Sequence, residues 1–93
     1  MQNRPNPFNP TTTIDFNLGY NESTGGIQKV RLDVFNILGQ QVKVLVDAEL
    51  EPGPHTVVWD GKNQAGQAVA TGVYLYRLQV DKEYQTKKML LLK

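Results

Sequence analysis

The residues that could carry acid–base or nucleophilic chemistry are few in this chain of 93 residues. His55 is the single histidine, Ser23 is the single serine, and cysteine is absent. A catalytic triad would need Ser23 on a nucleophile elbow, whereas Ser23 lies in a loop rich in glycine and asparagine. One imidazole without cysteine partners does not make a usual zinc site. We therefore expect no catalytic residue, no cofactor and no metal.

The acidic side chains are the remaining candidates for chemistry, and the pattern places them on outward strand positions or in turns. A glycosidase needs two carboxylates that converge in a cleft, and a domain of this size has little room for one. The stretch Asp60–Gly66 weakly resembles a calcium loop but lacks the alternating acids and the closing glutamate. We expect the Asp60 side chain to hold a turn instead.

The aromatic residues could form a platform for stacking sugars, but their spacing favours a core. Trp59 precedes the turn pair Asp60-Gly61, and Tyr74 and Tyr76 alternate with polar or smaller residues. We expect these three aromatic side chains to be mostly buried. The predicted structural core consists of Phe16, Leu32, Val34, Trp59, Tyr74, Tyr76 and Leu78.

The elements that must position these residues follow a period of two, which is typical of strands. About seven short strands are expected, over 12–18, 28–36, 42–46, 55–60, a short extended segment after Asp60, 73–80 and 84–92. Residues 47–54 are predicted to be a connector, and residues 81–83 a hairpin turn. On the second strand, Arg31 and Asp33 should point outward, and Phe35 and Ile37 break the pattern, which suggests a bulge or the start of a second apolar face. The pattern predicts an all-β antiparallel sandwich.

Composition limits the remaining classes. The net charge of +1 gives no indication of nucleic-acid binding. The longest apolar run, Met89–Leu92, is far shorter than the roughly 20 residues of a membrane helix, so no membrane insertion is expected. The length predicts a single domain over residues 1–93, in which residues 1–11 form an extended lead-in rich in proline and asparagine.

Five phrases of the sequence, taken together and in this order, carry a resemblance to known families. They are Pro5–Pro10 followed by Thr12–Ile14, Val34–Gln40, Trp59–Gly61, Gly72–Tyr76 and Lys87–Lys93. The chain resembles the C-terminal sorting domain (type A) of proteins exported by the type IX secretion system of Bacteroidetes and their relatives. It is also similar to the immunoglobulin-like domain of the flagellar hook-capping protein. Arg4, where a tyrosine is frequent, and a longer loop over 19–26 depart from the sorting-domain pattern.

The resemblance implies a non-catalytic immunoglobulin-like sandwich that is covalently linked to an N-terminal cargo domain. Its implied partners are the type IX outer-membrane machinery and a sortase-like peptidase. Its implied location is the cell surface or the medium, reached through the periplasm. For partner recognition, the final strand offers Lys87, Lys88, Met89, Leu91 and Lys93. If Leu90 and Leu92 face the core, Met89 and Leu91 face outward or cover the other sheet edge.

Two alternatives come from other classes. One is an accessory immunoglobulin-like or carbohydrate-binding module of a secreted glycoside hydrolase, in which an exposed aromatic residue would bind glycan. The other is a structural assembly domain of the hook-cap type.

Overall fold

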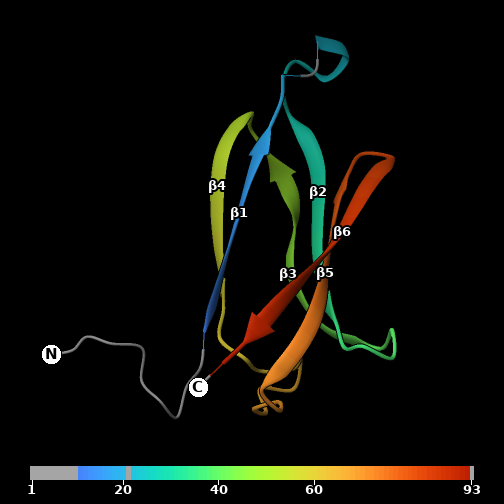
Figure 1. The fold of residues 1–93 in the computed structure, drawn as a ribbon. Coiled ribbons are helices and arrows are strands. Elements are labelled where there is room, and N and C mark those ends of the chain that lie inside the picture. Colours follow the sequence, from blue (N-terminus) through green and yellow to red (C-terminus); the bar gives the residue numbers. More distant parts are fainter. Residues whose placement is uncertain (1–10, 21, 93) are drawn as a thin grey trace, which may run out of the picture.

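The structure is a computed structural model that describes residues 11–20 and 22–92. In this part of the chain, six strands form two antiparallel sheets that face each other (Figure 1). One sheet has the order β1-β4 and the other the order β3-β2-β5-β6. The strands are β1 (Thr12–Leu18), β2 (Gln28–Phe35), β3 (Gln41–Leu50), β4 (Gly53–Trp59), β5 (Gly72–Val80) and β6 (Glu83–Leu91). The all-β antiparallel sandwich is thus confirmed.

Two predicted segments differ from the structure. The extended segment after Asp60 forms a single bridge, Lys62↔Ala68, so the described part has six strands where about seven were expected. The predicted connector over residues 47–54 is mostly strand, since β3 continues to Leu50 and β4 begins at Gly53. The reason is pairing: the β2–β3 ladder extends to Gln28↔Leu50 and overrides the weak strand propensity of these acidic residues.

The core lies between the two sheets and is centred on Trp59. This side chain is 0% exposed, and its ring meets that of Tyr74 edge-on at 5.0 Å. Trp59 Nε1 donates a hydrogen bond of 2.9 Å to the Lys62 carbonyl, which satisfies the one polar atom of the indole. The buried apolar side chains are Ile14, Leu18, Val30, Leu32, Val34, Trp59, Tyr74 and Leu91.

Three residues expected in the core are only half-buried, namely Phe16, Tyr76 and Leu78. All three lie on the side of the sandwich where β1 and β6 form the sheet edges. The expected lead-in over residues 1–11 falls, apart from Thr11, outside the described residues, as does Lys93.

Burial raises the pKa of Tyr74, whose hydroxyl donates to the Ala70 carbonyl. In the unfolded chain tyrosine ionises near pH 10, so above that pH the unfolded state loses the proton first. Stability should therefore fall as pH rises from about 10 toward the folded pKa. We expect this loss in urea unfolding between pH 8 and pH 11, and a shallower loss in Tyr74→Phe. Equal slopes in the two proteins would show that Tyr74 is not the cause.

Candidate functional site

The candidate contact surface is β6, the edge strand that ends the four-stranded sheet. Within residues 11–20 and 22–92, no strand pairs with its outer side. The direction of the β6 main-chain groups follows from the ladder between β2 and β5. At the end of that ladder, Asp81 N donates to the Lys29 carbonyl at 2.9 Å. Because pairing alternates along antiparallel strands, the even-numbered residues of β5 then turn toward β6.

The even-numbered β5 residues are paired with the odd-numbered residues of β6, as in Val80↔Glu83 and Tyr76↔Lys87. The main-chain groups of Tyr84, Thr86, Lys88 and Leu90 therefore point away from the sheet. A separate contact agrees with this, since the Leu90 carbonyl accepts a hydrogen bond of 3.1 Å from Thr12 Oγ1 on β1. The edge of β6 thus presents the amides and carbonyls of Tyr84, Thr86 and Lys88.

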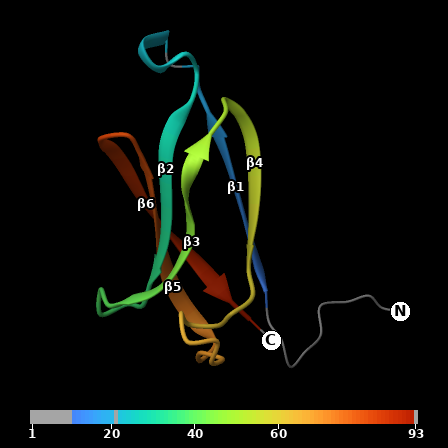
Figure 2. The ribbon, with the colours of Figure 1, turned by 180° about the vertical axis from the view of Figure 1, so that it is seen from behind.

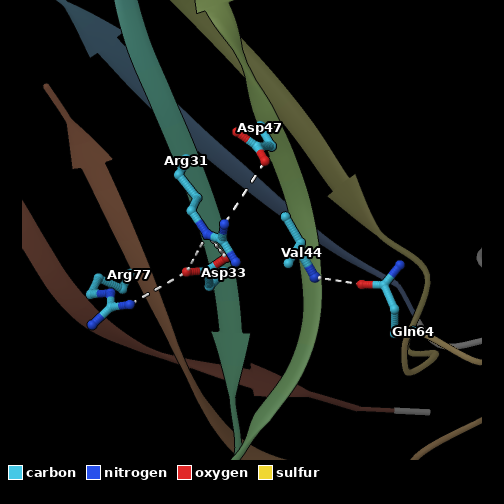
Figure 3. A network of polar contacts seen from close by, with 6 residues as sticks. All are labelled: Arg31, Asp33, Val44, Asp47, Gln64 and Arg77. Carbon is cyan, nitrogen blue, oxygen red and sulfur yellow. Dashed lines mark hydrogen bonds and ion pairs between the residues drawn. The ribbon is translucent and has the colours of Figure 1, made fainter.

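The opposite edge of the same sheet, β3, is partly covered. Gln64 N donates to the Val42 carbonyl at 3.0 Å, and Val44 N donates to Gln64 Oε1 at 2.9 Å (Figure 3). The loop that carries Gln64 is itself held by Asn63, whose Oδ1 accepts from Ala65 N at 3.0 Å. The β3 edge of the four-stranded sheet is therefore protected from strand pairing by the loop that carries Gln64, and the β6 edge is the more open one.

A groove separates the free edges of β1 and β6. The two strands meet where Thr12 contacts Leu90 and diverge toward the β5–β6 turn (Figures 1 and 2). The groove has a volume of about 260 Å³ and is lined by Asp15, Phe16, Asn17, Tyr76, Leu78, Gln85 and Lys87. A two-stranded sheet is too narrow to cover the inner face of four strands, which explains why Phe16, Tyr76 and Leu78 stay half-buried.

The apolar end of β6 has the opposite orientation to the one expected. Leu91 is 0% exposed and Met89 is half-buried, whereas Leu90 and Leu92 are 55% and 64% exposed. The pairing register is the cause: Met89 lies opposite Tyr74 and Leu91 opposite Gly72, so both share the inner face of Tyr74. The sequence-based assignment of Leu90 and Leu92 to the core is wrong.

This orientation predicts unequal costs for two neighbouring leucines. We expect Leu91→Ala to lower the free energy of unfolding by about 2–3 kcal/mol, because it removes a fully buried side chain. Leu90→Ala should cost less than about 1 kcal/mol, because that side chain is mostly in solvent. Urea unfolding followed by circular dichroism measures both. A larger loss for Leu90 than for Leu91 would contradict the register.

Lys87 and Lys88 are both exposed and lie on opposite faces of β6. Lys87 is on the groove side, and Lys88 is opposite Leu75 on the outer face of the sheet. β6 carries two lysines and one acidic residue, Glu83, and the turn before it adds Asp81 and Lys82. The expected role of Lys87, Lys88, Met89, Leu91 and Lys93 in partner recognition stays a prediction.

A polar network on the outer face of the four-stranded sheet was not foreseen from the sequence. Asp33 was expected to be outward and exposed, but its side chain is 2% exposed. Arg31 Nε lies 2.9 Å from Asp33 Oδ1, and Arg77 Nη2 lies 3.5 Å from Asp33 Oδ2 (Figure 3). Asp33 does point outward as predicted, but Arg31 of the same strand and Arg77 of the neighbouring strand β5 cover its carboxylate.

Arg77 joins this network to two aromatic rings. Its guanidinium carbon lies 5.0 Å from the centre of the Phe35 ring and 5.5 Å from that of Tyr84, at distances suited to cation–π contact. A hollow of about 380 Å³ lies on this side near Arg31, but its lining mixes Lys29 and Arg31 with three carboxylates. The network favours a rigid sheet surface rather than a site for one class of charged ligand.

The residues first considered for catalysis have structural contacts. His55 Nε2 is hydrogen-bonded to the Glu51 carbonyl at 2.7 Å, and its ring stacks on Phe16 at 5.4 Å. Ser23 lies in the 3₁₀ turn η1 (Glu22–Thr24), which projects beyond the sandwich (Figure 1). Asp60 Oδ1 accepts from Lys62 N at 3.2 Å, which confirms the predicted side-chain-held turn.

In the part of the chain that the structure describes, no group of three or more histidine, cysteine, aspartate or glutamate side chains could hold a metal ion. The same residues include no helix with the length and apolar character needed to cross a membrane.

Comparison with known proteins places this geometry in a family. A family model described as the FlgD Ig-like domain matches residues 10–84. A solved structure of FLGD from P. aeruginosa is similar with a TM-score of 0.63 and 21% identity, over 87% of this chain. This chain spans only 60% of the length of that one. A comparison with curated proteins gave no match. The chain therefore belongs to the FlgD Ig-like domain family.

Proposed function

We propose that this chain is a non-catalytic immunoglobulin-like module of a larger protein and acts through protein–protein contacts. The family match is the observation that carries the proposal, and it favours a structural assembly domain of the hook-cap type. The contacts of His55 and Asp60 agree with a role in stability rather than in chemistry. The sandwich supplies a stable body, and its exposed edge supplies the contact surface.

Sorting through the type IX secretion system is the second candidate. It is supported by the opening and closing phrases of the sequence, and by the place of the closing phrase in the fold. Leu91 is fully buried near the end of β6, so residues 87–91 of the closing phrase are part of the folded body and would be presented only by a folded domain. In this case the partners would be the type IX outer-membrane machinery and a sortase-like peptidase, and the parent protein would reach the surface or the medium.

A carbohydrate-binding module has less support. The indole of Trp59 is 0% exposed and Tyr74 is 7% exposed, so neither ring face is open to a sugar. Stacking on a glycan needs an accessible ring, which leaves Tyr20 and Tyr84, 67% and 64% exposed, as the candidates for such a contact.

Deletion in the parent protein separates the two leading candidates. The organism of origin would produce the tagged full-length protein with and without the segment described here, and the cell fractions would be compared. For an assembly domain, the shortened protein still leaves the cytoplasm and is exported, but it no longer enters its oligomeric structure on a native gel. For a sorting domain, the shortened protein stays in the periplasm. Unchanged export and assembly would overturn both.

A further inference from the structure

The outer edge of β6 is not paired with another strand of the described residues, and the groove beside it leaves apolar side chains partly uncovered. Tyr84, Thr86 and Lys88 direct their main-chain groups away from β5, as the ladder and the Thr12–Leu90 contact indicate. The adjoining groove has a floor of half-buried apolar side chains, Phe16, Tyr76 and Leu78. An extended segment placed there would pair with β6 and cover this floor at once.

The charges along β6 indicate which charge such a segment would carry. Lys87 and Lys88 are exposed and are the charged residues of 84–88, whereas Glu83 and the turn residues Asp81 and Lys82 lie at the start of the strand. The groove lining contains both Lys87 and Asp15, whose carboxylate accepts a hydrogen bond of 2.7 Å from Thr56 Oγ1, whereas the outward side chains of β6 include Lys88 and no acid. A segment with acidic side chains would therefore be attracted, whereas like charges directly across a strand pair are destabilising.

We propose that β6 binds an extended acidic segment of a partner protein by strand addition. The segment pairs with the main chain of Tyr84, Thr86 and Lys88, and its inward apolar side chains enter the groove between β1 and β6. A second copy of this chain fits less well, since two β6 strands would bring Lys87 and Lys88 of each copy to one interface. The inference rests on the proposed function only in that the domain acts by binding protein.

The test uses a blocked ten-residue peptide that alternates valine with glutamate, and a control peptide that alternates valine with lysine. Calorimetry should show binding of the acidic peptide, weakened as the salt concentration rises from 50 to 500 mM, and no binding of the basic one. The substitution Lys88→Glu, on the outer face where the glutamates of the peptide lie, should lower the affinity for the acidic peptide about tenfold or more.

Amide exchange measured by NMR tests the pairing itself. On adding the acidic peptide, the amides of Tyr84, Thr86 and Lys88 should become protected. The amides of Gln85 and Lys87 already face β5, so their protection should change little. A surface contact without strand pairing would not produce this alternation.

Two proline variants separate loss of binding from loss of fold. Thr86→Pro removes an amide that faces away from β5, and proline is tolerated on such an edge, so the domain should stay folded but lose the peptide. Gln85→Pro removes an amide of the β5–β6 ladder and should destabilise the domain. A folded Thr86→Pro variant that still binds the peptide with unchanged affinity would overturn strand addition.

Two further outcomes would also contradict the inference. If neither peptide binds, the lysines of β6 only protect the edge from pairing. If the domain self-associates in sedimentation experiments and the peptide does not compete, the occupant is a second copy. In both cases the deletion experiment on the parent protein could still support assembly or sorting, so the two proposals fail separately.

Discussion

Replacing Trp59 with alanine is expected to lower the free energy of unfolding by about 3–5 kcal/mol. The indole is 0% exposed, packs edge-on against Tyr74 and contacts the central cluster that includes Val34 and Leu91. Its removal leaves a cavity between the two sheets and also frees the Lys62 carbonyl from its hydrogen bond. Since small domains are stable by only about 5–15 kcal/mol, the variant should be close to unfolding.

The measurement is chemical unfolding followed by far-ultraviolet circular dichroism, because the variant lacks the only tryptophan. Trp59→Phe is the matched control: it keeps most of the apolar volume and loses the indole donor, and it should cost less than the alanine variant. In the unchanged protein, tryptophan emission should shift to longer wavelength on unfolding. A loss below about 1 kcal/mol for Trp59→Ala would contradict its central place in the core.

Replacing Asp33 with alanine should cost about 3 kcal/mol, because it removes the shared buried partner of two arginines. Arg31 and Arg77 both contact this carboxylate, which is 2% exposed. The guanidinium of Arg77 would stay between Phe35 and Tyr84 without its counter-charge. The arginines are partly exposed and can turn to solvent, so we expect the lower end of the range for a broken buried pair.

Asp47→Ala provides the control for this prediction. Asp47 pairs with the same Arg31, but the nitrogen–oxygen distance is 3.8 Å and the Asp47 side chain is 71% exposed. Exposed pairs contribute little, so this variant should lose less than about 1 kcal/mol in urea unfolding. Similar losses for the two aspartates would show that burial of Asp33 does not determine its contribution.

In the final strand, β6, the sequence pattern was not sufficient to predict which side chains face the core. The run Met89–Leu92 is apolar throughout, so it carries no alternation that would indicate a face. A three-residue turn over 81–83 would place Leu90 and Leu92 on the face of Tyr74, whereas Val80 pairs with Glu83 around a turn of two residues. Because side chains alternate along a strand, this difference of one residue exchanged the inner and outer leucines.

Alternation along the chain by itself determined that this protein is an all-β sandwich, located most of its strands and identified Trp59 as a buried residue. It also indicated on which face of β2 Asp33 lies. Only the tertiary structure decided how much each face is covered. Asp33 is buried because Arg77, 44 residues away, lies beside it on β5, and the groove stays open because two strands face four. Period-two patterning is a local property of one strand, whereas coverage depends on neighbours that sheet pairing brings from distant parts of the chain.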